Sequence, residues 1–287
     1  MLWYNNCMKK SKIKIHRRAK LGLVLGGGGG LGVAHIGAIK AFEELGIDFQ
    51  YVAGTSAGSL VGALYASGKT SEELTEIAKK LKVKDIRNSQ FILKPSTAEN
   101  IENIIKDVLG ADLMFSELKR KFSAVCVDMK IGAEVDLSYG SVAKVVSGSC
   151  AVPGVFKPVE YLDMHLVDGG LKNNLPTDVV RDMGANVVIA VELNHGKGFG
   201  TESLNMFKVL TNSLSIMMAS AVAPKFAIAD IVLHPNMSGF SKLNLNDIDS
   251  RIALGYNAVM DNKEEILKII KRRPRKNLNY VKKSKIK

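Results

Sequence analysis

Residues 21–45 carry the sequence LGLVLGGGGGLGVAHIGAIKAFEEL, and this stretch decides the fold. Residues 21–25 form a short apolar run of the kind that is buried as a strand. After the glycine-rich stretch 26–32, apolar residues recur at helical spacing over 32–45, and the pattern ends at Gly46. A strand, a glycine loop and a helix in this order predict the first unit of an α/β fold, with backbone N–H groups of the loop free to face an anion.

The same order of elements recurs around a single serine. A strand is predicted over 48–53 and a helix of small residues over 56–67, and they are joined by the turn Gly54-Thr55-Ser56-Ala57-Gly58. In a G-x-S-x-G turn, small neighbours let the chain bend sharply, which exposes the serine hydroxyl at the top of the sheet. The turn predicts Ser56 as a nucleophile, and the alternative is an ordinary serine cap at the start of a helix.

Strands and helices continue to alternate along the rest of the chain. Strands are predicted over 122–128, 134–138, 159–162, 165–167, 186–193 and 231–234, helices over 71–81, 98–109, 141–150, 176–183, 203–222 and 248–271, and a loop over 88–95. The run 186–193 is apolar enough to be buried on both faces, as in parallel sheets. The pattern predicts one α/β domain over 21–270, a three-layer α/β/α sandwich with a mainly parallel sheet, whose motifs lie in 22–183.

Positive charge is concentrated at the two ends of the chain. The formal net charge is +12, yet residues 1–20 hold seven Lys and Arg and residues 271–287 hold nine, with no acid in either segment. The body 21–270 keeps 24 basic and 28 acidic residues, so both ends are predicted to be basic tails. Such tails are usually solvated, and the alternative is attraction to an anionic membrane surface. Nucleic acid, bound without sequence preference, is not the expected partner.

Composition predicts neither secretion nor a membrane span. The basic N-terminus is not followed by an apolar signal region, and no uncharged apolar run of about 18 residues occurs. Cys7, Cys126 and Cys150 are widely spaced and form no CxxC pair, which favours a reducing compartment and predicts no zinc or redox site. We therefore expect a cytoplasmic protein, free or peripheral on the membrane, without metal or cofactor.

The glycine stretch by itself allows two functions. The spacing Gly27-x-Gly29-x-x-Gly32 after a strand fits a dinucleotide-binding turn, in which Asp48 would be the acidic residue expected about 20 positions later. The same stretch fits an oxyanion hole, which stabilises the negative charge that develops in acyl transfer. The nearby Ser56 turn favours the oxyanion hole.

An acidic turn and several histidines are candidates for the catalytic base. Asp168-Gly169-Gly170 follows a predicted strand and can present its carboxylate there, although Asp-Gly turns are common. A Ser–Asp–His triad would need His195 or His234. His35 has apolar neighbours on the first predicted helix and is expected to be structural.

Four ordered blocks make the chain resemble the bacterial patatin-like phospholipases. The blocks are VLGGGGGLGVAHIGAIKAFEE (24–44), GTSAGSLVGALYASG (54–68), SGSCAVPGVFKPV (147–159) and VDGGLKNNLP (167–176). The resemblance implies a three-layer α/β/α sandwich and a serine lipid acyl hydrolase of the phospholipase A or esterase type. The expected substrate is a phospholipid or another acyl-ester lipid, and no cofactor or metal is implied.

The resemblance also implies roles for single residues. The Ser–Asp dyad of the family matches Ser56 and Asp168, which removes the need for a catalytic histidine. The oxyanion loop matches Gly27, Gly28 and Gly29, and the remaining motif glycines match Gly32, Gly54, Gly58, Gly169 and Gly170.

One position departs from the family pattern. Leu31 stands where the family usually carries Arg or Lys, so a charge that would orient the loop or hold an anionic head group is missing. The alternative function is therefore a catalytically weak or inactive lipid-binding or regulatory protein with the same fold.

The methionines of the helix predicted over 203–222 suggest an acyl groove. Met206, Met217 and Met218 supply flexible thioethers, which adapt to the shape of an acyl chain. A core position or a subunit contact is the alternative for such a stripe.

Overall fold

A computed structural model describes residues 15–81, 96–196, 206–272 and 274 of the chain. The loop predicted over 88–95 lies outside the described residues, as do most of the two basic tails and the first residues of the helix predicted from 203.

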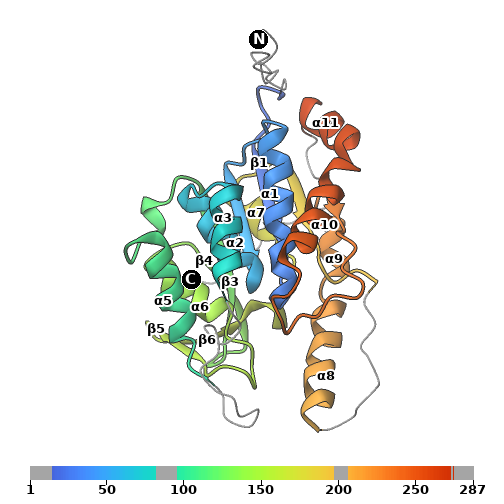
Figure 1. Cartoon of the computed structure of the whole chain (residues 1–287). Coiled ribbons are helices and arrows are strands. Elements are labelled where there is room, and N and C mark those ends of the chain that lie inside the picture. Colours follow the sequence, from blue (N-terminus) through green and yellow to red (C-terminus); the bar gives the residue numbers. More distant parts are fainter. Residues whose placement is uncertain (1–14, 82–95, 197–205, 273, 275–287) are drawn as a thin grey trace, which may run out of the picture.

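An eight-stranded mixed sheet forms the middle layer (Figure 1). Its parallel part has the order β3-β2-β1-β7-β8, formed by Lys121–Asp128, Tyr51–Thr55, Leu21–Leu25, Val187–Val191 and Ile231–Leu233. The antiparallel strands β4 (Ala133–Leu137), β6 (Met164–Asp168) and β5 (Val159–Tyr161) extend the sheet beyond β3. The prediction of a mainly parallel sheet is confirmed, with an antiparallel portion at one side.

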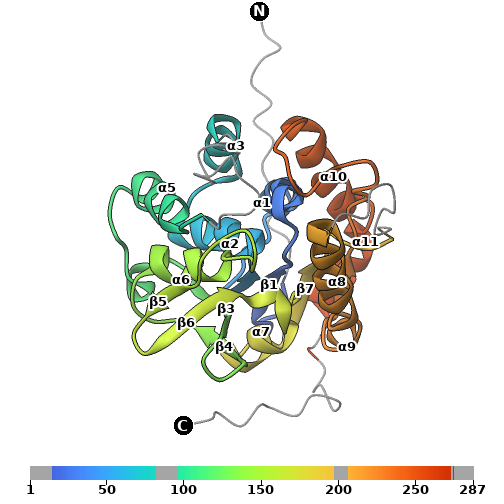
Figure 2. The same cartoon turned by 90° about the horizontal axis from the view of Figure 1, so that it is seen from below.

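Helices cover both faces of this sheet (Figure 2). On one face lie α1 (Ala34–Glu44), α2 (Ala57–Ser67) and α6 (Val142–Ser149), and on the other lies α7 (Thr177–Met183). Buried hydrophobic side chains form a larger core on the first of these faces and a smaller core on the second. Leu23 and Leu25 of β1 belong to the larger core and Val24 to the smaller one, because successive side chains of a strand point to opposite faces. The predicted three-layer sandwich is therefore confirmed.

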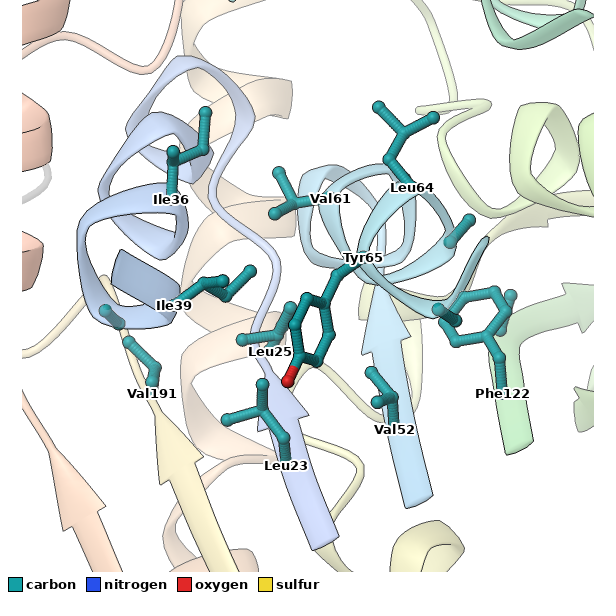
Figure 3. Close-up of a cluster of buried hydrophobic side chains, with 14 of the residues drawn as sticks. Leu23, Leu25, Ile36, Ile39, Val52, Val61, Leu64, Tyr65, Phe122 and Val191 are labelled. Carbon is teal, nitrogen blue, oxygen red and sulfur yellow. The ribbon is translucent and has the colours of Figure 1, made fainter. Parts of the chain in front are cut away.

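The larger core fixes the two helices that follow the glycine loop and the serine turn. Figure 3 shows Leu23 and Leu25 of β1 next to Tyr65 of α2, with Ile39 of α1 beside them. Burying one Leu or Ile side chain of this kind stabilises the fold by about 1.5–3 kcal/mol. Packing of α1 and α2 thus sets the positions of the loops at their N-terminal ends.

The remaining helices surround this core. They are α3 (Ser71–Lys80), α5 (Glu99–Leu109), α8 (Met206–Ser220), α9 (Ala223–Phe226), α10 (Ile248–Met260) and α11 (Lys263–Lys271). α10 packs backbone to backbone on α1, since a Cβ at Gly37 would lie 1.8 Å from Ile252 O and one at Gly255 would lie 1.7 Å from Ala34 O. Within the described ranges, no helix has both the length and the apolar character needed to cross a membrane.

The prediction of one continuous helix over 248–271 is wrong, because two helices, α10 and α11, occupy this range. The chain leaves the helix predicted over 248–271 at Asp261 and Asn262 and starts a new one at Lys263. The Asn262 amide donates to Ala258 O at 2.9 Å, an example of how asparagine competes with helical hydrogen bonding. The other predicted elements agree with those observed to within three residues at each end, as far as they are described.

Candidate active site

Ser56 occupies the turn between β2 and α2. Its backbone has φ 53° and ψ −127°, a region that non-glycine residues rarely adopt. Gly54 allows the sharp bend, because a Cβ there would lie 2.3 Å from Gly58 O. The Ser56 N–H donates to Ser149 Oγ at 3.0 Å, and Ser149 Oγ donates to Val125 O at 2.6 Å. The serine turn is thus held by both α6 and β3.

Sheet register brings Asp168 to the same place. On β3, Val125 pairs with Thr55, the residue before the serine, and the next residue, Cys126, pairs with Asp168. The Ser56 side chain lies close enough to Asp168 to lower the pKa of its carboxyl. The predicted nucleophile and the predicted base are therefore brought together.

The Asp168 carboxylate is buried, and only one of its two oxygens accepts a hydrogen bond among the described residues. Oδ1 accepts the Gly170 N–H at 2.8 Å, while Oδ2 has no hydrogen-bond partner of standard geometry among the described residues. The Ser56 hydroxyl thus approaches the carboxylate without a full hydrogen bond in this resting geometry. Burial raises the pKa of Asp168 to about 6, against the opposing effects of Ser56 and Gly170. The group is still ionised at neutral pH but holds a proton better than an exposed aspartate.

The glycine loop packs directly on this pair. A Cβ at Gly27 would lie 3.3 Å from Ser56 Cβ and 2.2 Å from Asn174 Oδ1, and a Cβ at Gly170 would lie 2.9 Å from the same oxygen. Asn174 therefore sits between the glycine loop and the Asp168 turn. Gly32 allows the helix behind the loop to approach α2, since a Cβ there would lie 2.6 Å from Ala57 Cβ.

Three backbone N–H groups that neighbour Gly27 or Ser56 along the chain are candidates to bind an oxyanion. Those of Gly28, Gly29 and Ala57 donate to no acceptor in the part of the chain that is described. The Gly27 N–H, in contrast, donates to Asn174 O at 3.1 Å, so Gly27 shapes the predicted oxyanion loop without offering it a donor. Ala57 was missed by sequence reasoning, although its position directly after the nucleophile is the signal that could have found it.

Polar side chains hold the loop in place from three elements. Asn174 Nδ2 and Asn194 Nδ2 donate to Gly27 O at 3.3 and 2.8 Å, and His35 Nε2 contacts Gly26 O at 2.7 Å. Burial lowers the pKa of His35 to about 4, so the ring is neutral and donates, in line with the expected structural role. Sequence reasoning missed both asparagines, although Asn174 lies in the block VDGGLKNNLP.

A segment from the C-terminal part of the chain supports the outer side of the loop. The Gly30 N–H donates to Lys242 O at 2.8 Å. The buried Arg251 of α10 fastens this segment by donating to Asn246 O at 2.7 Å, Ser241 O at 3.0 Å and Asn244 Oδ1 at 2.7 Å. Leu31 itself is completely buried, so a side chain of the core replaces the expected cation.

Only part of the methionine prediction concerns described side chains. A Cβ at Gly170 would lie 2.4 Å from the Met218 methyl group, so α8 reaches the Asp168 turn. Met217 is 59% exposed, and the Met206 side chain lies outside the described residues. Figure 1 shows that α8 stands out from the body of the molecule.

The structure does not support the dinucleotide-binding turn or the Ser–Asp–His triad, the two alternatives that the sequence left open. Asp48 precedes β2 and pairs with Arg120 at 2.9 Å, so it lies at the edge of the sheet opposite to the glycine loop, where it cannot bind a ribose beside that loop. Ser56 and Gly170 are the groups whose polar atoms lower the pKa of Asp168, and neither His195 nor His234 is among them.

Comparisons with known proteins identify the family and the fold of this chain. A family model for patatin-like phospholipase matches residues 23–181. An uncharacterized NTE family protein of Mycobacterium bovis is 34% identical over 182 residues, which cover 61% of this chain and 49% of that protein. Patatin-like phospholipase domain-containing protein 6 of Mus musculus is 36% identical over 186 residues, covering 60% and 13%. The crystal structure of VipD from Legionella pneumophila is similar with a TM-score of 0.57 at 14% identity, covering 86% of this chain and 67% of that one.

The family match contains the residues that form the site. Ser56, Asp168 and the glycine loop lie inside it, whereas Lys242 and Arg251 lie beyond it. The chain spans about half the length of the mycobacterial relatives it matches. Because the family model covers more than half of its residues, this chain belongs to the patatin-like phospholipase family.

Proposed function

We propose that this protein is a serine lipid acyl hydrolase that cleaves fatty-acyl esters with a Ser56–Asp168 dyad. One observation carries the proposal: a strained serine turn and a buried aspartate lie together at one edge of the sheet, against a glycine loop whose Gly28 and Gly29 N–H groups have no acceptor among the described residues. Membership of the patatin-like phospholipase family supports a lipid ester as the substrate class.

In the first step, Ser56 Oγ attacks the ester carbonyl carbon and its proton passes to Asp168. Oδ2 is the suitable acceptor because it has no other partner among the described residues. A base with a pKa of about 6 accepts a proton from the attacking hydroxyl more readily than an exposed aspartate does. The tetrahedral intermediate then expels the alcohol, which takes the proton from Asp168. Water attacks the acyl-enzyme by the same route and releases the fatty acid.

Negative charge on the tetrahedral intermediate would be stabilised by the N–H groups of Gly28, Gly29 and Ala57. Ala57 opens α2, so the positive end of the helix dipole adds to this effect. Losing one oxyanion donor typically costs about 2.7–4 kcal/mol. General base catalysis contributes about 10²–10⁴-fold in rate, which corresponds to roughly 2.7–5.4 kcal/mol in total. We therefore expect the preorganised loop to contribute at least as much as the proton transfer.

Helix α8 reaches the Asp168 turn through Met218 and carries exposed apolar side chains on its other faces. Met218 contacts the Asp168 turn, and Val209, Ile216 and Met217 are exposed on the same helix. An acyl chain or the lipid surface itself can pack on such side chains. This surface supports a lipid over a small soluble ester as the substrate.

The proposal is tested by separate Ser56→Ala and Asp168→Asn variants assayed with a short-chain aryl ester and a labelled phospholipid. Each change removes one member of the proton-transfer pair, so we expect turnover to fall by at least about 10²-fold in both. The half-buried Ser67→Ala and the exposed Asp163→Asn, both outside the site, serve as controls and should retain activity. Near-normal turnover in either dyad variant would defeat the mechanism.

A lipid-binding protein without turnover is the second candidate, because Leu31 leaves the glycine loop without the usual cation. It predicts that the folded wild-type chain binds phospholipid vesicles but hydrolyses neither substrate.

A further inference from the structure

A second cluster of functional side chains lies beside the glycine loop. Glu192 and His195 follow β7, and His234 follows β8. β7 and β8 are parallel neighbours, so the segments after them meet at one edge of the sheet. One ligand atom from each of the three side chains lies within 4.8 Å of the other two.

The spacing of these atoms suits a metal ion. Ligands about 2.0–2.2 Å from a tetrahedral centre are roughly 3.4 Å apart, and Glu192 Oε2 lies 3.3 Å from His234 Nδ1. The His195 ring centroid is 4.3 Å from that of His234. Because His195 is exposed, a small rotation of its side chain completes a site with three ligands.

The surroundings provide charge and space. Glu192 is buried; its Oε1 accepts the Asn194 N–H at 2.7 Å, and its Oε2 faces His234 Nδ1. Its carboxylate is therefore held in place toward the two histidines. A hollow of about 460 Å³, bordered by His195, His234 and Phe240, leaves room for a water molecule at the open position.

We propose that Glu192, His195 and His234 bind one divalent transition-metal ion of the Zn²⁺ or Co²⁺ type. Two imidazoles and one carboxylate form a donor set used by zinc sites that keep a fourth, open position. The sequence alone did not predict this metal site, because His234 is 42 residues from Glu192 and only the pairing of β7 with β8 brings the two side chains together.

The site has a direct structural connection to the glycine loop. Asn194, between two of the ligands, donates to Gly27 O at 2.8 Å. The segment after His234 leads to Lys242, whose carbonyl accepts the Gly30 N–H. A bound ion would therefore join the two segments that hold the loop, which makes its ligands positioning residues. Metal binding itself does not depend on the acyl hydrolysis proposed above.

The test uses the full chain without a polyhistidine tag, treated with a chelator and titrated with Zn²⁺ by calorimetry and with Co²⁺ by visible absorption. We expect one ion per chain and the intense visible bands of tetrahedral Co²⁺. His195→Ala, His234→Ala and Glu192→Gln should each weaken binding by at least about tenfold, whereas His165→Ala should leave it unchanged. Circular dichroism checks that every variant is folded.

Two results would overturn the proposal. One is the absence of Zn²⁺ or Co²⁺ binding by the folded wild-type chain, which would leave the contact between Glu192 and His234 as an internal hydrogen bond alone. The other is equal affinity in the wild type and in a folded His195→Ala/His234→Ala double variant, because the ion would then be bound elsewhere. Retained binding in Glu192→Gln would remove the carboxylate from the ligand set.

Discussion

Ser56 combines its proposed chemical role with a strained backbone. A left-handed φ at a non-glycine residue costs about 1–3 kcal/mol and persists only where neighbours enforce it. Here Ser149 accepts the Ser56 N–H, and Ser59 Oγ donates to Ser56 O at 2.7 Å. This backbone conformation directs the hydroxyl toward the Asp168 turn. The fold is therefore less stable at the position where the proposed reaction needs a fixed nucleophile.

This strain predicts different stabilities for two inactive variants. Ser56→Gly and Ser56→Ala both remove the hydroxyl, but only glycine relieves the strained φ, so Ser56→Gly should be more stable by about 1–2 kcal/mol. Thermal or urea unfolding measures the difference. At Ser67, the last residue of α2, the order should reverse, because glycine weakens an ordinary helix position. The same order at both positions would show that the Ser56 turn is not strained.

The raised pKa of Asp168 predicts a stability that depends on pH. The folded-state pKa is about 6 and an exposed aspartate titrates near 3.9, so the folded chain holds the proton more tightly. Its contribution to stability is present below about pH 4 and is lost as pH rises through about 6. Asp168→Asn should therefore stabilise the protein by roughly 2–3 kcal/mol at pH 8 and hardly at all below pH 4.

Unfolding of the wild type and Asp168→Asn across this pH range measures the effect. Asp230→Asn is the control with the opposite sign, because Asp230 forms ion pairs with Arg181 and Arg272 at 2.7 and 3.1 Å, which the change removes. A gain for Asp168→Asn that is equal at pH 4 and pH 8 would contradict the assigned pKa.

Single residues were predictable from sequence where a local motif fixes them. The turns around Ser56 and Asp168 place these side chains at strand ends without help from distant contacts. Asn174 and Asn194 were not predictable, because their contacts with Gly27 span 147 and 167 residues.

At the scale of elements, the glycine loop depends on a segment outside the family match. Arg251 of α10 is 1% exposed and fixes the segment that accepts the Gly30 N–H. We expect Arg251→Met to cost about 2–4 kcal/mol, since it removes three hydrogen bonds donated by a charged group. It should also lower kcat for a small aryl ester at a temperature where the variant is folded. The exposed change Ser250→Ala on the same helix should alter neither value.

A purely structural role for Arg251 would reduce stability while leaving kcat of the folded variant unchanged. That outcome would separate the C-terminal segment from the geometry of the oxyanion loop.

Element types were predictable from periodicity, whereas some ends were not. Buried strands such as β7 and amphipathic helices such as α5 have clear patterns. The break between α10 and α11 depends on Asp261 and Asn262, whose polar side chains also occur inside helices, so the apolar pattern of 248–271 continues across it. The predicted start of β2 is three residues too early, because the apolar side chain of Phe49 extends the strand pattern toward the N-terminus.

At the scale of the whole molecule, the sheet gathers the site from distant parts of the chain. The loops after β1 and β2, the end of β6 and the segments after β7 and β8 meet at one edge. Sequence motifs identified the first three, and pairing of β7 with β8 was needed to see the Glu192 cluster. Solvated basic tails, with attraction to an anionic membrane as the alternative, concern residues mostly outside the described ranges and stay a prediction.

The most direct test of the dyad is to locate the adduct of a fluorophosphonate probe by mass spectrometry. The account predicts one adduct per chain on the peptide that contains Ser56, lost in Ser56→Ala and formed much more slowly in Asp168→Asn. An adduct on a different residue, or undiminished ester turnover by protein in which Ser56 is fully modified, would contradict it.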